Sequence, residues 1–129
     1  MSDSDTSLVS KRAAQVSFAV AGIVPVVAGL WGVFQPLAGA VGSQLNHGRY
    51  LSGLLLAIGL IFWASIPGIE RRTARIRVLT VVVVIGGVCR LLGVMLGDPL
   101  SLPVAGALAM ELAVTPLLCF WQSRLAPRE

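Results

Sequence analysis

Four long apolar stretches constrain the fold of this chain more than any other feature of its sequence. They run over Ala13 to Phe34, Tyr50 to Pro67, Ile76 to Gly97 and Leu102 to Trp121. A helix needs about 20 apolar residues to cross the hydrocarbon core of a bilayer. The 129 residues are 56% hydrophobic and only 12% charged, which leaves too little polar surface for a soluble domain. The sequence predicts an all-α, four-transmembrane-helix bundle in one membrane domain, residues 13–122.

The N-terminal polar segment has two possible interpretations. Lys11 and Arg12 precede an apolar run, as in a secretory signal peptide. This run exceeds the ~7–15 residues of a signal peptide, and no A-x-A cleavage site follows at a suitable distance. We therefore expect a retained first span behind a disordered segment, residues 1–12. Two cysteines, Cys89 and Cys119, fall inside spans at different depths, so no disulfide is expected.

Positive charges are distributed unevenly around the four spans. Eight of the ten Lys and Arg residues lie before span one, between spans two and three, or after span four. In a four-span chain these three regions share one side, and basic residues favour the cytoplasm. The sequence predicts an inner-membrane protein with the N-terminus and the tail, residues 123–129, both cytoplasmic. The basic central link has a second interpretation, as a site for anionic lipid headgroups on Arg71, Arg72, Arg75 and Arg77.

Span three and span four each contain a charged side chain, Arg90 and Glu111. If the two spans fold about the turn near Ser101, each charge lies about 15 Å from the outer surface, at 1.5 Å per residue. An unpaired charge at that depth costs at least ~3 kcal/mol. The sequence therefore predicts an ion pair, either as a buried clip between the spans or as part of a polar pocket open to the outer side.

Several polar residues are candidates for the mouth of this pocket. Thr115, one turn from Glu111, would extend its polar track, and the spacing of Gly93 and Gly97 is typical of close helix packing. Gly97 is expected to cap the end of span three, and Asp98 and Ser101 the start of span four, with Pro103 in its first turn. The mouth residues expected at the outer surface are Asn46, His47 and Arg49 in the loop before span two, Tyr50 at the start of that span, and Asp98.

No catalytic signature accompanies these residues. The sequence has no Walker loop, dinucleotide-binding glycine pattern, nucleophile elbow, HExxH motif or histidine pair for haem. One histidine and two cysteines within spans make no metal motif. The sequence predicts no cofactor, no metal and no nucleic-acid partner, and it leans away from an enzyme.

Three sequence segments resemble those of a known family: NHGRYLSGLLLAIGLIFW, GGVCRLLGVMLGDP and ELAVTPLLCFWQSR. They are similar to a family of small bacterial four-helix integral membrane proteins of unknown function, over about residues 15 to 125. The resemblance implies a fold and matches Arg49, Arg90, Asp98 and Glu111 as motif positions. It implies no activity.

Three functions remain open from the sequence. The first is a non-catalytic accessory or structural subunit of a larger membrane complex. The second is a small transporter or binder, in the manner of four-span transporters that dimerise around a membrane glutamate. An arginine beside the glutamate favours an anionic or amphiphilic ligand over proton exchange. The third, a lipid-modifying enzyme, has no nucleophile and base pair to support it.

Overall fold

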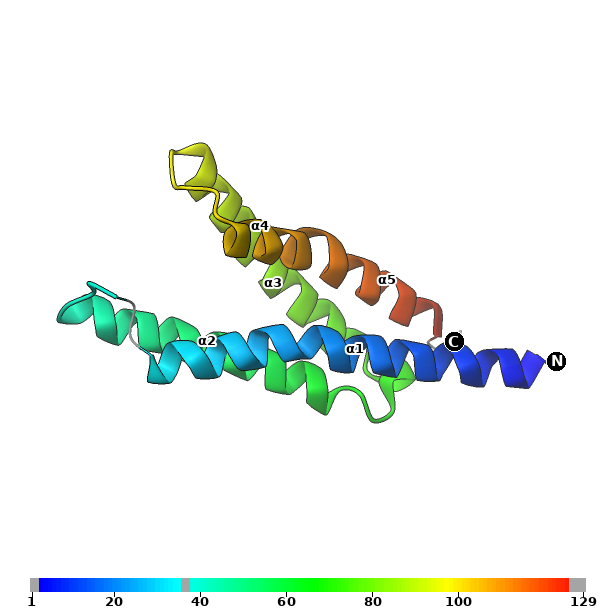
Figure 1. Ribbon diagram of the computed structural model, residues 1–129. Helices are drawn as coiled ribbons and strands as arrows, with labels where there is room; N and C mark the ends of the chain where they lie inside the picture. Colours follow the sequence, from blue (N-terminus) through cyan, green and yellow to red (C-terminus); the bar gives the residue numbers. More distant parts are fainter. Residues whose placement is uncertain (1–2, 36–37, 126–129) are drawn as a thin grey trace. The chain divides into compact units, whose positions relative to one another are not determined.

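The computed structural model describes residues 3–35 and 38–125, and 86% of these residues are helical, with no strand among them (Figure 1). The elements are α1 (Asp3–Phe34), α2 (Ser43–Ala64), the 3-10 turn η1 (Ile69–Arg71), α3 (Thr73–Met95), α4 (Leu102–Ala109), the π-helical turn η2 (Met110–Val114) and α5 (Thr115–Leu125). Because α4, η2 and α5 follow one another without a break, the described chain has four long helical segments. The predicted all-α class is confirmed.

Each long segment is long and apolar enough to cross a membrane. The helices nevertheless extend beyond the apolar stretches. α1 begins at Asp3, inside the segment expected to be disordered, and Asp5 in its first turn complements the helix dipole. α2 begins at Ser43, so Asn46, His47 and Arg49 lie on a helix and not in the loop that the sequence predicted. Hydropathy reports where bilayer contact ends, and a helix can continue past that point.

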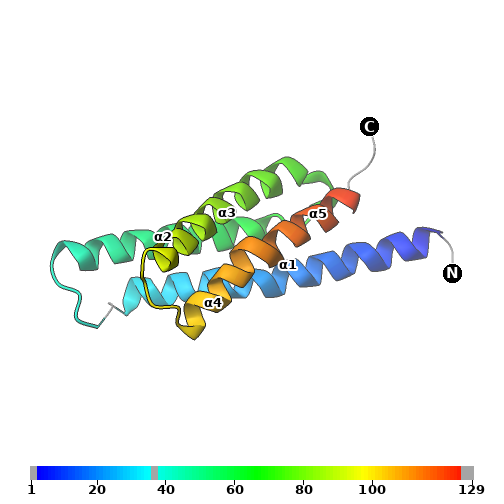
Figure 2. The same ribbon diagram turned by 90° about the horizontal axis from the view of Figure 1, so that it is seen from above.

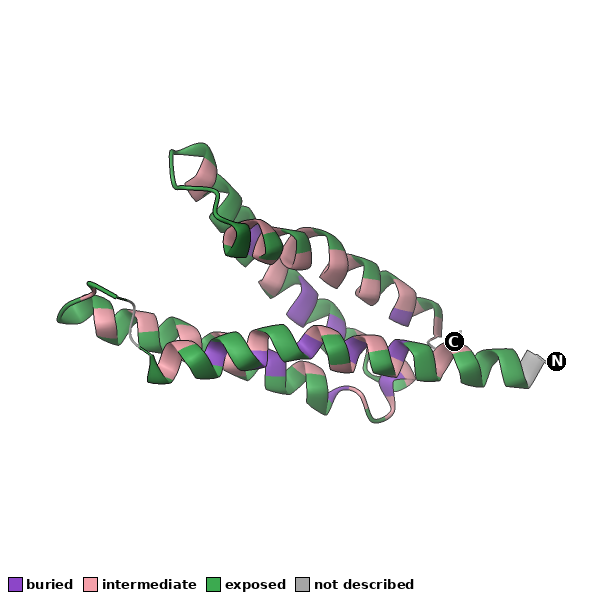
Figure 3. Ribbon diagram, viewed as in Figure 1, coloured by how far each residue is buried: buried purple, intermediate pink, exposed green. Residues whose placement is uncertain are grey.

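The chain divides into two compact units, Phe18–Ile66 and Met1–Ser17 together with Pro67–Glu129. We call the first the α1–α2 hairpin and the second the α3–α5 unit. In the hairpin, α1 and α2 run side by side in both views (Figures 1 and 2). In the α3–α5 unit, α3 runs beside the continuous α4–η2–α5 segment. Exposed residues predominate along the helices of both units (Figure 3).

Glycines set the close approach of the two helices in the hairpin. Gly22 lies against the indole of Trp63, whose Nε1 donates a 3.0 Å hydrogen bond to the carbonyl of Ala19. A Cβ on Gly29 would lie 2.6 Å from the backbone nitrogen of Leu56. The spacing of Gly53 and Ala57 is typical of a packing face, but Gly53 plays no such part within its own unit, because a Cβ there would meet nothing within 4 Å.

The α3–α5 unit is closed at one end by a buried glutamine. Gln122 is fully buried, and its Nε2 donates hydrogen bonds to the carbonyl of Ile69 at 2.7 Å and to Oγ1 of Thr73 at 2.9 Å. Ile69 and Ile76 are fully buried beside these groups. The amide thus joins the end of α5 to η1 and to the start of α3.

The same end of this unit holds an ion pair that the sequence did not suggest. Nζ of Lys11 in α1 lies 2.9 Å from Oε1 of Glu70 in η1. This hydrogen bond, helped by one from the backbone, holds the pKa of the Glu70 carboxyl below its usual value of 4.5, although burial opposes the shift. Together with Gln122, the pair brings the three basic segments of the sequence to one end of the unit.

The Glu70 pair predicts a small loss of stability in acid. A carboxyl whose pKa is lowered on folding stabilises the folded state above its unfolded pKa, and that contribution disappears as the pH falls through the folded value. Because both side chains are partly exposed, we expect no more than about 1 kcal/mol. Unfolding in detergent between pH 6 and pH 3 should show a steeper loss for the wild type than for Glu70→Gln. An equal loss of stability with falling pH in the two proteins would contradict a stabilising Lys11–Glu70 pair.

Candidate functional site

The central feature of the α3–α5 unit is a forked ion pair between Arg90 and Glu111. Nε of Arg90 donates to Oε2 of Glu111, and Nη2 donates to Oε1, both at 3.1 Å. Arg90 lies on α3 and Glu111 on η2. Two parallel hydrogen bonds fix the orientation of both side chains more firmly than a single contact would. The structure thus brings together the two charges that the sequence placed at equal depth.

Gly87 explains why the two helices approach closely enough for this pair. It is buried one turn before Arg90, and a Cβ there would lie 2.9 Å from Cβ of Glu111 and 2.8 Å from Cδ2 of Leu112. Any larger residue would push η2 away from α3. Of the adjacent glycines Gly86 and Gly87, only Gly87 serves this packing, because a Cβ on Gly86 would meet nothing within 4 Å.

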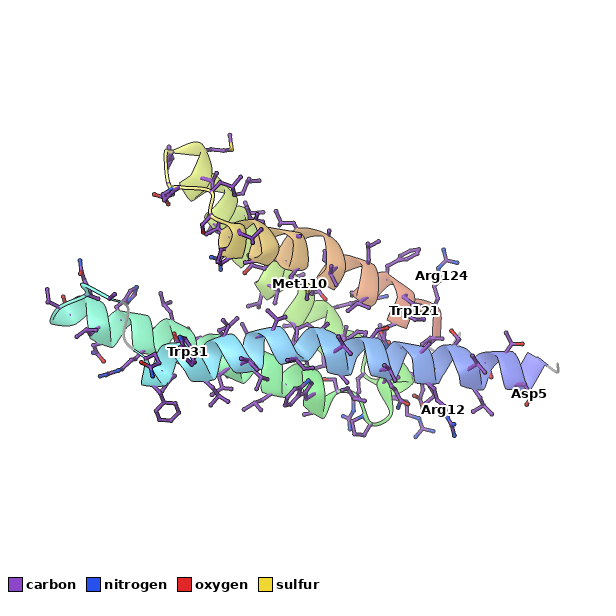
Figure 4. All side chains as sticks on the ribbon, viewed as in Figure 1. Asp5, Arg12, Trp31, Met110, Trp121 and Arg124 are labelled. Carbon is purple, nitrogen blue, oxygen red and sulfur yellow. The ribbon has the colours of Figure 1, made fainter. Side chains whose placement is uncertain are left out.

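Glu111 lies in a π-helical turn, and Pro116 gives a physical reason for it. Proline has no N–H to donate to the carbonyl four residues earlier, so the regular α-helical ladder is interrupted. Thr115 bridges the interruption, because both its backbone N–H and its hydroxyl donate to the carbonyl of Met110, the latter at 2.8 Å. Met110, labelled in Figure 4, marks the start of this turn. A proline inside a span predicts a kinked or loosened helix, and the π-turn is the form that this takes here.

The same hydrogen bond changes the expected role of Thr115. Its hydroxyl was predicted to extend the polar track from Glu111, but it is donated to the helix backbone. The π-turn inserts an extra residue into one turn and thereby shifts the direction in which the preceding side chains point. Turns of this kind are frequent at functional sites. Glu111 occupies the second position of the turn.

Arg90 keeps hydrogen-bonding capacity beyond Glu111. A guanidinium has five N–H donors, and among the described residues only Glu111 accepts from it. The side chain of Arg90 is 41% exposed, against 17% for Glu111. The remaining donors therefore face away from the carboxylate, within a helix long and apolar enough to span a membrane.

Asp98 lies at the end of α3 and not at the start of span four. The N–H of Asp98 bonds to the carbonyl of Gly93 at 3.0 Å, and the N–H of Gly97 bonds to that of Val94 at 3.1 Å. With Gly97 at a φ of 114°, this is a Schellman motif. The Asp98 carboxylate folds over Gly93, so the GxxxG glycines form a helix cap and not a packing face. Ser101 occupies the N-cap position of α4 without a side-chain cap bond, and Pro103 lies in its first turn as predicted.

The other residues expected at the pocket mouth divide between two faces of α2. Arg49 lines a groove between α1 and α2. Asn46, His47 and Tyr50 line a separate hollow, where the rings of His47 and Tyr50 are stacked with centroids 6.5 Å apart. The structure does not gather these four around one opening, since a turn of helix points them in different directions.

The groove beside Arg49 has a volume of about 880 Å³. Apolar side chains line most of its length, and polar side chains gather where α1 ends and α2 begins. No sequence pattern indicates this groove, because its walls come from the two sides of a hairpin.

The four arginines of the central link are all exposed. Arg71 ends η1, Arg72 precedes α3, and Arg75 and Arg77 lie in the first turns of α3. Among the described residues, no group of three or more His, Cys, Asp or Glu side chains could hold a metal ion. Cys89 and Cys119 are free thiols.

These features define a helical protein with four segments long and apolar enough to cross a membrane. The chain belongs to the family described as Domain of unknown function (DUF4345), which matches residues 13–122. The match confirms the resemblance to a family without an assigned activity. Comparison with curated proteins and with solved structures found no match.

Proposed function

We propose that this protein is a non-catalytic accessory subunit of a membrane complex and that it meets its partner at the Arg90–Glu111 pair. One observation carries the proposal: Arg90 is 41% exposed and retains N–H donors beyond the two that bind Glu111. In hydrocarbon, an unsatisfied donor costs several kcal/mol. A carbonyl, hydroxyl or carboxylate on a neighbouring transmembrane helix would satisfy these donors.

The placement of the other charges supports an orientation for the subunit. Lys11, Glu70 and Gln122 join the three basic segments at one end of the α3–α5 unit. Basic residues flanking spans favour the cytoplasmic side. We therefore propose that both termini are cytoplasmic, in the inner membrane of a bacterium, and that Arg71, Arg72, Arg75 and Arg77 lie near anionic headgroups there.

A double variant, compared with the wild type, tests the subunit proposal in the native host. The variant with Arg90→Leu and Glu111→Leu removes the donors while leaving no unpaired charge. A photo-crosslinking residue at Gly86, one turn from Arg90, should capture a membrane protein in the otherwise wild-type chain, and the double substitution should abolish this adduct. Native mass spectrometry of both forms in mild detergent should show the same protein retained and then lost. An adduct that persists in the double variant would contradict the proposal.

The second candidate function, a binder or transporter of an anionic or amphiphilic ligand, is favoured by the same free donors. The same native mass spectrometry experiment distinguishes this function from the subunit proposal. A small molecule or lipid, in place of a second protein, would be retained by the wild type and lost from the double variant.

A further inference from the structure

A largely apolar groove of the α1–α2 hairpin carries a single cationic side chain at one end. Its walls come from α1 on one side and from the first turns of α2 on the other. The lining residues that matter here are Ile23, Val27, Trp31, Gln35, Gln44 and Arg49. The first three make an apolar floor along α1, and the last three are polar and lie where the helices end and begin. The groove is therefore amphipathic along its length.

The dimensions of the groove suit an acyl chain. Along α1 it extends from Ile23 to Gln35, which corresponds to about 18 Å at 1.5 Å per residue. Its volume of about 880 Å³ lies within the 300–1,000 Å³ range of small-molecule sites. Trp31, near the C-terminal end of α1, is 68% exposed on this wall, and Figure 4 labels it there. Tryptophan is the residue that favours the boundary between acyl chains and headgroups.

Arg49 supplies a positive charge that complements an anionic headgroup. It immediately precedes the apolar run of α2 that starts at Tyr50, so it lies at the level where headgroups begin. Within the described part of the hairpin, its guanidinium has no hydrogen-bond or ion-pair partner. Ser52, which also lines the groove, donates its hydroxyl to the carbonyl of Gly48 at 2.8 Å, so it has no proton left to donate to an anion. Arg49 is thus the one charged donor at the polar end.

We propose that the α1–α2 groove binds an anionic phospholipid, with one acyl chain along Ile23 and Val27 and the phosphate on Arg49. A planar guanidinium binds a phosphate through two parallel hydrogen bonds, a geometry that a zwitterionic headgroup with its own cation satisfies less well. Gln35 and Gln44 offer amide donors and acceptors to the glycerol and ester oxygens. This site is separate from the Arg90–Glu111 pair, so either proposal can fail without the other.

Native mass spectrometry tests the inference with the full chain in nanodiscs. Discs contain either phosphatidylcholine alone or phosphatidylcholine with phosphatidylglycerol, and the lipids retained after release are counted. The wild type should retain phosphatidylglycerol in preference to phosphatidylcholine, and Arg49→Gln should lower that preference about tenfold, as expected for a lost charge-assisted hydrogen bond. Arg49→Lys should restore part of it. Arg12→Gln, which removes an exposed arginine of α1 that does not line the groove, is the matched control and should leave the preference unchanged.

A second variant separates the contribution of the apolar wall of the groove from that of the Arg49 charge. Ala28→Trp fills the apolar wall and leaves Arg49 in place, and it should also lower phosphatidylglycerol retention. Inorganic phosphate added at millimolar concentration should not displace the lipid if the acyl chain contributes. The inference is overturned if Arg49→Gln binds as the wild type does, if Ala28→Trp has no effect, or if free phosphate competes fully. Unchanged melting temperatures of the variants would show that lost binding is not lost folding.

Discussion

Replacing Arg90 with methionine should destabilise the chain by about 3 kcal/mol, the cost of an unpaired carboxylate inside a membrane span. The carboxylate of Glu111 is only 17% exposed and would lose both of its hydrogen bonds at once. It would then stand as an unpaired charge inside an apolar helix. Titration with SDS from a mild detergent, followed by circular dichroism, gives the free energy of unfolding. We expect Glu111→Gln to cost less, because its amide keeps one acceptor for the guanidinium.

A double variant shows whether the Arg90–Glu111 pair serves recognition or packing. Arg90→Met with Glu111→Met removes both charges, and methionine fills a similar volume without a polar group. Charged pairs replaced in this way are often neutral or stabilising. If stability returns while the partner or ligand is lost, the pair is retained for recognition. If stability stays low, the fork is needed to hold α3 against η2. A loss in the double variant equal to the sum of the losses in the two single variants would mean that the two side chains are not coupled.

The sequence predicted the α-helical class and the Arg90–Glu111 pair for the same reason. Both follow from the high cost of polar groups in hydrocarbon, which acts on composition and on depth along a helix. It did not predict the π-turn, because the response of a helix to Pro116 depends on whether Thr115 can donate to Met110. Helix rise places residues along an axis but does not reveal this local shift.

The glycines also show that spacing along one helix does not predict which residues contact a neighbouring helix. Gly93 and Gly97 match a packing motif, yet the structure uses them to end α3: Gly97 takes the positive φ of the predicted cap, and the Asp98 carboxylate lies over Gly93. Gly22, Gly29 and Gly59 form no obvious motif, yet they make the close approach of α1 and α2. Which glycine faces a neighbour depends on how two helices pair, and the spacing of glycines within one helix does not determine that pairing.

Gly29→Ala should be the most damaging single-methyl change in the α1–α2 hairpin. The new Cβ would lie 2.6 Å from the backbone nitrogen of Leu56 and 2.8 Å from its Cα, and backbone atoms cannot rotate aside as a side chain can. Separating the helices to relieve this contact should cost about 1–3 kcal/mol, the range for overpacked sites. That loss exceeds the gain of up to about 1 kcal/mol that alanine brings to a helix interior.

Gly53→Ala provides the matched control within the same hairpin. Gly53 also lies in a helix interior, but a Cβ there would meet nothing within 4 Å, so only the gain in helix propensity remains. SDS titration should therefore show the two substitutions moving stability in opposite directions. If Gly29→Ala is tolerated as well as Gly53→Ala, then α1 and α2 do not meet at Leu56. The groove beside Arg49 depends on that same approach, because α1 and α2 form its two walls, and it would then lose its shape as well.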